Sequence, residues 1–317
     1  MPTYNTGVTR TGTLGTDTDP LVPEPAVASV IQEAVKSSAA LQQFRQVQMA
    51  AGTLRQPVLD ALPHAYWVAG DAGLKQTANV EWGNIDLVAE EIATIVPIPD
   101  AYVADSQIPI WDEIRPLLGQ AIGTLIDAAT IFGTNAPGTF GNSVFEVADA
   151  VGNTVTAGTN DDLAADVSAL GQLLAEQGFG VTGFLSKPGF TWQLNGLRSA
   201  DGVPIYQTNL QAGIGRSLFG YPLNEVGNGA WSTSDATLIA GDFTKAILGI
   251  RQDVSYKVFD QGVIADADGK VVWSAMQNDG MALRVTMRLA FATANPVTAV
   301  ESSSLERAPF AYLAPGT

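Results

Sequence analysis

The sequence predicts an α+β fold, in which helices and antiparallel strands are mixed without an alternating strand–helix–strand order. Two observations carry this prediction. Apolar residues recur with helical spacing in three stretches, whereas residues 53–104 and the chain after Trp231 are rich in β-branched and aromatic residues with partial alternation. No internal repeat of fixed period is evident, so we expect neither a solenoid nor a propeller.

The first 24 residues are rich in Thr, Gly, Asp and Pro and have no apolar period. Such a segment cannot bury enough surface to fold alone, so it is either a disordered tail or an arm that becomes ordered on a neighbouring subunit. Residues 25–50 then predict a helix that starts near Pro25 and stops at Gly52. Its apolar face is formed by residues three and four apart, namely Val27, Val30, Ile31, Ala34 and Val35.

Residues 53–104 predict two long strands that form an extended β-hairpin. The turn between them is expected around Gly70, Asp71 and Gly73. Several aromatic residues lie close to this tip, where a monomer covers them poorly and another chain would cover them well. They are Tyr66, Trp67 and Trp82. The alternative is a hairpin that folds flat onto its own core.

A long amphipathic helix is predicted from about Pro109 to Phe132, with Gly133 closing it. Ser106 is a candidate N-cap for this helix, and acidic residues follow it near the positive end of the helix dipole. Pro116 lies inside the pattern, which predicts either a kink or a later start.

The chain from Thr134 is Gly-rich, and we expect it to be irregular as far as Asn160, which is a candidate cap for a helix ending at Gly178. A strand, a Pro-Gly turn and a short helix should follow. Two Asp-Gly turns are predicted, at Asp201–Gly202 and Asp268–Gly269, the second of which would link two strands.

The composition is poor in charge and strongly acidic. Only 15% of the 317 residues are charged, against about 25% in an average globular domain. Extensive contact between subunits would account for this, and so would a large compact monomer. With 32 acidic and 16 basic residues and no basic run, the chain is not expected to read nucleic-acid sequence. A surface of this charge would not adhere to DNA, or the acidity serves solubility alone.

The start of the chain has no signal-peptide pattern, and no run approaches the roughly 18 apolar residues needed to cross a bilayer. We therefore expect no membrane partner. Cysteine is absent and His64 is the single histidine, which excludes thiolate chemistry and leaves any Ser-His-Asp triad dependent on one residue. No phosphate-binding loop or complete calcium loop is present. We expect no catalytic residue, no cofactor and no metal.

Six stretches in this order resemble the major capsid proteins of tailed phages with the Hong Kong 97-type fold. The stretches are VPIPDAYVADS, LIDAATIFGTN, FLSKPGFTWQLNGLRSADGVPIY, SLFGYPLNEV, AGDFTKAILGIRQDVSYKVF and ALRVTMRLAFATANPVTAV. The order of expected elements is also similar to that family: arm, helix, long hairpin, long helix, then a mixed region that returns to long strands. The resemblance covers nearly the whole chain from about residue 20.

This resemblance implies five parts. Residues 1–52 would form the N-terminal arm and helix, 53–90 the E-loop hairpin, and 91–135 the P-domain with its spine helix. Residues 136–255 would form the A-domain, and 256–317 the returning strands of the P-domain and the C-terminal segment. Many members of the family carry a long helical domain before the arm that acts as a scaffold, whereas here only about 24 residues precede the first expected helix. The resemblance therefore implies a separate scaffolding protein or self-assembly on a short arm.

The resemblance also implies a function. The chain would assemble with itself into hexamers and pentamers of an icosahedral head that encloses double-stranded DNA without sequence-specific binding. It would be made in the host bacterial cytoplasm and end in the virion, with scaffolding, portal and decoration proteins as further partners. The expected subunit-interface residues are Tyr66, Trp67, Lys75 and Trp82.

Some alternatives stay open. An encapsulin, a cellular protein cage, has the same fold and would hold cargo enzymes. A hydrolase built on His64 and a monomeric carbohydrate-binding domain are rivals from other classes. Lys75 stands where the prototype of the family forms a covalent cross-link, but the Asn partner and the assisting Glu find no match here. A solvated or salt-bridging tip residue is therefore favoured over a cross-link for Lys75.

Overall fold

The computed structural model describes residues 38–68, 75–106, 110–160, 162–196 and 217–316. They fall into two compact units. The smaller one contains the described residues of 91–119 and 252–287, and the larger one contains those of 36–90, 120–251 and 288–317. No described helix is long and apolar enough to span a membrane.

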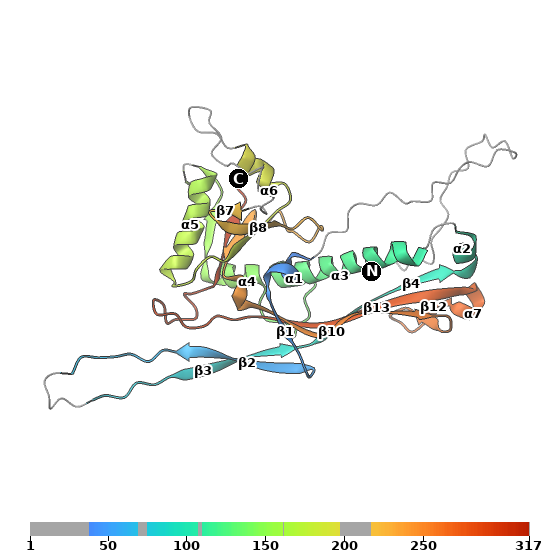
Figure 1. Ribbon diagram of the computed structural model, residues 1–317, viewed down its shortest axis with the longest axis horizontal. Helices are drawn as coiled ribbons and strands as arrows, with labels where there is room; N and C mark the ends of the chain where they lie inside the picture. Colours follow the sequence, from blue (N-terminus) through green and yellow to red (C-terminus); the bar gives the residue numbers. More distant parts are fainter. Residues whose placement is uncertain (1–37, 69–74, 107–109, 161, 197–216, 317) are drawn as a thin grey trace. The chain divides into compact units, whose positions relative to one another are not determined.

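The larger unit is built around a six-stranded sheet with the strand order β5-β14-β9-β6-β8-β7 (Figure 1). Its pairings are mixed, since β14 runs antiparallel to β9 but parallel to β5, and β6 runs parallel to β8. The strands are β5 (Thr154–Thr156), β6 (Gly183–Ser186), β7 (Ser217–Leu218), β8 (Tyr221–Glu225), β9 (Leu238–Gly241) and β14 (Phe310–Ala314).

Both faces of strand β14 carry a helix, because successive residues of a strand point to opposite sides. Leu313 belongs to a buried apolar cluster with Leu170 and Leu174 of α5 (Leu163–Glu176). On the other face, the Tyr312 ring lies 4.7 Å from that of Phe145 in α4 (Val144–Val151). A short helix, α6 (Phe190–Asn195), follows β6.

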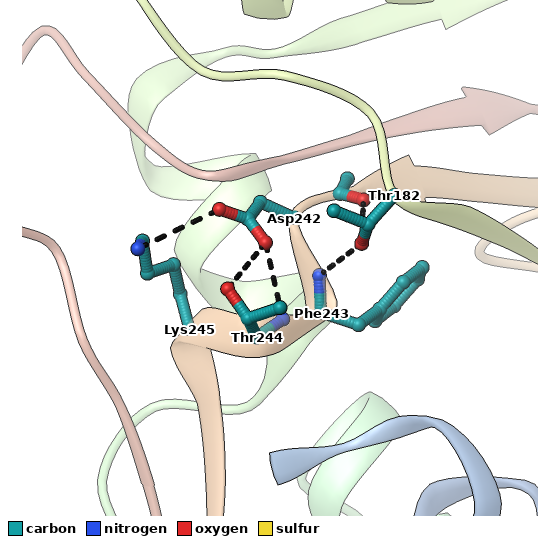
Figure 2. A network of polar contacts seen from close by, with 6 residues as sticks. Thr182, Asp242, Phe243, Thr244 and Lys245 are labelled. Carbon is teal, nitrogen blue, oxygen red and sulfur yellow. Dashed lines mark hydrogen bonds and ion pairs between the residues drawn. The ribbon is translucent and has the colours of Figure 1, made fainter.

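A short turn, η1 (Phe243–Lys245), leads from β9 into the long strand β10 (Ala246–Phe259), and Figure 2 shows its polar contacts. The Asp242 carboxylate accepts hydrogen bonds from Thr244 N at 3.1 Å and Thr244 Oγ1 at 2.6 Å, and it pairs with Lys245 at 3.6 Å. Gly241 is required before it, since an added Cβ would lie 2.5 Å from the Pro309 carbonyl oxygen. The G-D-F stretch is therefore a cap that turns the chain out of the sheet.

A second sheet has the order β1-β10-β13-β4. Its strands are β1 (Arg45–Gln48), β4 (Glu90–Pro99), β10, and β13 (Gly280–Thr293). The smaller unit contains a two-stranded sheet of β11 (Val263–Ala265) and β12 (Val271–Ser274), followed by α7 (Ala275–Asn278). The predicted Asp268–Gly269 turn is confirmed between them: Asp266 accepts hydrogen bonds from the N–H groups of Asp268 and Lys270.

The long helix prediction is confirmed by α3 (Ile110–Phe132), and Gly133 closes it with a positive φ of 71°. Ser106 follows a separate short helix, α2 (Asp100–Asp105), and residues 107–109 between it and α3 lie outside the described residues, so its role as an N-cap stays a prediction. The alternative of a late start after Pro116 is wrong, because α3 continues through this proline.

The predicted helix over residues 25–50 is wrong in its described part. Only α1 (Ala39–Gln43) is helical, and Phe44 already has extended backbone. The chain then forms β1, which pairs in parallel with Arg45 opposite Ile247. Hydrogen bonds to a distant strand override the local helical periodicity. Gly52 ends no helix; its carbonyl accepts a hydrogen bond from Ala89 N at 2.8 Å.

The prediction of a second long strand within residues 53–104 is correct in that the chain forms strands there, but wrong in that they are not one continuous strand. It is divided at Ala89 into β3 (Glu81–Val88) and β4, which belong to different sheets, and residues 100–105 form α2. The region expected to be irregular contains α4, whose capping box joins Ser143 and Glu146. The sequence Ser-Val-Phe-Glu is the local signal for such a box.

The predicted cap of the next helix is wrong by two residues, because Asp162 caps α5. Asn160 instead binds the buried Asp166. The Asp201–Gly202 turn, the tip at residues 70–73 and the chain before residue 38 lie outside the described residues. The strand, Pro-Gly turn and short helix after Gly178 are confirmed by β6 and α6.

The buried carboxylate of Asp166 should make the free energy of unfolding of the larger unit depend on pH. Its burial raises the pKa of the carboxyl, but hydrogen bonds from Gly158 N at 2.7 Å, Asn160 N at 3.0 Å and Asn160 Nδ2 at 2.9 Å lower that pKa below its usual value. An unfolded aspartate titrates near 4, so the stabilisation by Asp166 is present above that pH and is lost as pH falls through the lower folded value. In urea unfolding, Asp166→Asn should be less stable than wild type at pH 7, and this gap should narrow below about pH 4. A constant gap would contradict the prediction.

Candidate assembly surfaces

The predicted hairpin is present as an antiparallel pair of β2 (Thr53–Ala61) and β3 (Figure 1). The pairing runs from Thr53 opposite Val88 to Leu59 opposite Trp82, and a shift of register follows Leu59. Residues 62–68 and 75–80 continue beyond the paired strands without strand structure.

The base of the hairpin is packed within the larger unit. Leu87 is fully buried in an apolar cluster with Met49, Ile247 and small residues of β13, and Leu54, Val58 and Ile85 pack against this cluster. The Leu59 carbonyl also accepts a hydrogen bond from Val297 N at 3.1 Å. At these residues the hairpin is therefore packed on its own core.

A buried arginine organises the loop that contacts the far end of strand β2. Arg307 is 1% exposed and donates to three backbone carbonyls, those of Pro296 at 3.0 Å, Asn295 at 3.2 Å and Ser302. Burial lowers the pKa of its guanidinium, against the opposing attraction of Asp60 and Glu301. Because Asp60 lies on β2, this loop and the hairpin interact electrostatically as well as through the Leu59 hydrogen bond.

Across the exposed edge of the hairpin, Arg55 and Asp86 face each other in register. Arg55 Nε lies 2.8 Å from Asp86 Oδ1, and Nη2 lies 3.3 Å from Oδ2. This hydrogen bond lowers the pKa of Asp86. The pair is open to solvent, so it aligns the two strands more than it stabilises them.

Of the four residues predicted to contact other subunits, Tyr66, Trp67 and Lys75 lie beyond the paired strands toward the tip, whereas Trp82 lies on β3 opposite Leu59. Trp67 is 101% exposed and Trp82 is 68% exposed, and Lys75 is exposed as well. Tyr66 is half-buried, and its hydroxyl donates to the Gln76 carbonyl at 2.9 Å, which joins the two arms. The structure thus places all four on one hairpin and leaves both indole rings open to solvent. Their contact with another chain stays a prediction.

Large apolar surfaces that sequence analysis missed occur elsewhere in the described residues. Phe219 is 58% exposed and has a positive φ of 51°, which is a strained conformation for a bulky residue. Trp192 of α6 is exposed too, as are Met276 and Leu305. Each of these four residues is flanked by polar or turn residues, so the sequence around it shows no periodic pattern of apolar residues that would predict an exposed apolar surface.

The described residues contain no group of side chains placed to hold a metal ion. His64 lies exposed in the hairpin, and no group of three or more His, Asp or Glu side chains in the described ranges is placed to hold a metal ion. The surfaces that require explanation are apolar ones.

Comparison with known proteins decides the family. The model of the phage capsid family matches residues 19–300. The chain belongs to the phage capsid family. Among solved structures, a protein of Microbacterium phage Oxtober96 is 36% identical, with a TM-score of 0.82 over 93% of this chain and 97% of that one. A protein of Mycobacterium phage Bobi is 30% identical, with a TM-score of 0.83 over 94% and 97%.

A curated relative of this capsid protein is the major capsid protein of Staphylococcus phage 80alpha, 25% identical over 266 residues, which are 82% of this chain and 78% of the relative. The α+β fold of the Hong Kong 97 type is thereby confirmed, and a phage capsid protein is favoured over an encapsulin. Within this fold the hairpin, the long helix α3 and the six-stranded sheet are the main parts.

Proposed function

We propose that this protein is the major capsid protein of a tailed phage, and that many copies assemble into the hexamers and pentamers of an icosahedral head. The observation that carries the proposal is the hairpin. Its base is anchored by buried Leu87, whereas within the described chain Trp67 is fully exposed and Trp82, on β3, is 68% exposed. In a shell-forming protein, other copies of the chain would cover these exposed tryptophan side chains, because each subunit lies against its neighbours.

The domain plan expected for this family supports that role. Residues 53–90 would be the E-loop, residues 91–135 the part of the P-domain with the spine helix, and residues 136–255 the A-domain. In this plan the E-loop lies over a neighbouring subunit and the A-domains meet around the local symmetry axes. Many weak contacts of this kind give a stable shell because each subunit is held at several places at once.

The charge of the chain supports an enclosing wall around DNA and not a binding surface. A net charge of −16 repels phosphates, so packaged double-stranded DNA would be confined without adhering. We propose no catalytic activity, and the exposed His64 gives no reason for one. The shell would form in the cytoplasm of the host bacterium, with scaffolding, portal and decoration proteins as candidate partners.

Electron microscopy of the expressed full-length protein, alone and with a co-expressed scaffolding protein, tests this function. We expect closed shells with hexamers and pentamers of this chain. Light scattering that finds monomers alone at every concentration, with and without a scaffold, would contradict the proposal and favour a monomeric binding domain.

The contents of the particles distinguish a phage capsid from an encapsulin. Wide shells from infected cells that contain double-stranded DNA support the capsid, whereas small shells filled with a host enzyme would support an encapsulin. Denaturing electrophoresis of the same particles tests the less favoured idea of a Lys75 cross-link, for which subunits linked beyond the monomer would be required.

A further inference from the structure

The smaller unit contains an apolar recess with a cationic rim. It lies between the open face of the sheet strands β4, β10 and β13 and the β11–β12 hairpin, and its volume is about 210 Å³. The wall is mainly apolar and contains no carboxylate. The residues that matter here are Ile95, Phe259, Val263, Ile264, Trp273 and Arg284.

Two cations lie beside one ring in this recess. Lys257 Nζ is 5.0 Å from the centre of the Phe259 ring, and the Arg284 guanidinium carbon is 4.8 Å from it. Neither forms an ion pair in the described chain, where the ion pairs found involve other residues. Two like charges attracted to one ring, without an anion between them, leave a surface that favours a negative ligand.

The wall of the recess is also exposed where a ligand would lie. Ile95 is 46% exposed and Val263 is 62% exposed, although both are β-sheet residues with apolar side chains. A fitting ligand therefore combines an aliphatic side chain, which covers these residues, with carboxylates close to it in sequence. A DNA phosphate supplies the charge but not the aliphatic part.

One segment of this chain outside the described residues has that chemistry. Residues 17–24, Asp-Thr-Asp-Pro-Leu-Val-Pro-Glu, hold three carboxylates around Leu21 and Val22, and no basic residue occurs between Arg10 and Lys36. The other long segment outside the described residues, 197–216, has two arginines and a single aspartate. Charge complementarity thus selects residues 17–24. From Asp19 to Ser38 the chain can span roughly 60 Å when extended, about twice the diameter of a small domain.

We propose that residues 17–24 of a neighbouring subunit bind this recess, with Leu21 or Val22 against Ile95 and Val263 and the flanking carboxylates beside Lys257 and Arg284. This inference rests on the proposed function, since it requires assembled subunits. It gives the N-terminal segment a defined binding site and explains why Lys257 and Arg284 lie on an apolar surface without an ion-pair partner among the described residues.

The absence of cysteine from the chain allows a direct test. In assembled full-length particles, the double variant Leu21→Cys/Val263→Cys should form disulfides under mild oxidation, because a disulfide requires Cα atoms within about 7 Å. Non-reducing electrophoresis should show dimers and longer ladders that reduction dissolves. Adding Arg284→Gln should lower the cross-linked fraction at least about threefold, whereas adding Lys270→Gln, at the nearby β11–β12 turn, should leave it unchanged.

Two further pairs complete the experiment. Leu21→Cys/Leu305→Cys places the second thiol on an exposed residue of the larger unit and should give no ladder. Trp67→Cys/Val263→Cys tests whether the hairpin tip occupies the recess instead. The proposal is overturned if particles form but the first pair gives no more product than the Leu305 pair, if the product is an internal disulfide of one chain, or if the Trp67 pair alone cross-links. Failure of the wild-type protein to form particles would instead contradict the proposed function.

Discussion

Replacing Asp127 with asparagine is expected to lower the free energy of unfolding of the subunit by about 3 kcal/mol. Asp127 lies on α3 and is fully buried. Its Oδ1 accepts hydrogen bonds from Ser38 Oγ at 2.5 Å and Ala40 N at 3.0 Å, and its Oδ2 accepts from Ala39 N at 3.0 Å and Asn228 Nδ2 at 2.6 Å. An amide at this place puts an NH₂ group against two of these donors and leaves buried polar groups unpaired.

Urea unfolding of disassembled subunits, followed by tryptophan fluorescence, measures this effect. Asp112→Asn on the same helix is the matched control, because Asp112 is exposed and its partner Arg115 lies 3.4 Å away on the surface. The control should change the free energy of unfolding by no more than about 0.5 kcal/mol. Equal stabilities of the two variants would show that the Asp127 contacts contribute little.

Shortening Trp67 or Trp82 to alanine is expected to impair assembly strongly while leaving the subunit folded. A buried tryptophan at an interface typically contributes 2 kcal/mol or more, so the protein concentration needed for half-assembly should rise at least about tenfold. The free energy of unfolding of the isolated subunit should change by no more than about 0.5 kcal/mol, since both rings are exposed there. Light scattering against concentration and urea unfolding measure the two quantities.

Trp67→Tyr is the control for the assembly defect, because it keeps a large aromatic ring and should restore most of the assembly. Trp273→Ala tests the opposite case, since Trp273 is 9% exposed and its loss should destabilise the subunit itself. If Trp67→Ala reduced unfolding stability as much as Trp273→Ala does, the ring would serve the fold and not the shell.

Several features of the site could be predicted from the sequence alone. The hairpin and its exposed aromatic residues follow from local β-branched patterning, and the stripe of α3 follows from helical spacing with Gly133 as its stop. These are short-range signals, and each is strong over many residues. The capping box of α4 was equally local, but two turns of helix in a Gly-rich region give too short a period to stand out.

The cationic recess could not be predicted in this way. Phe259 and Arg284 lie on different strands, and nothing in the stretch around either residue indicates that a lysine and an arginine meet at one ring. The same holds for Arg307, whose three carbonyl partners are grouped by a loop without regular structure.

The sequence by itself determined the α+β class, the hairpin, the long helix and the family resemblance, because these depend on residues close together in the chain. The tertiary structure alone decided that Arg45–Gln48 is a strand and that β3 and β4 separate at Ala89. It alone also decided that the Asp127 carboxylate accepts hydrogen bonds from the backbone N–H groups at the start of α1. The physical reason is the same in each case. Strand pairing and the satisfaction of a buried carboxylate depend on partners far away in sequence, and the free energy of these non-local contacts exceeds the local conformational preference.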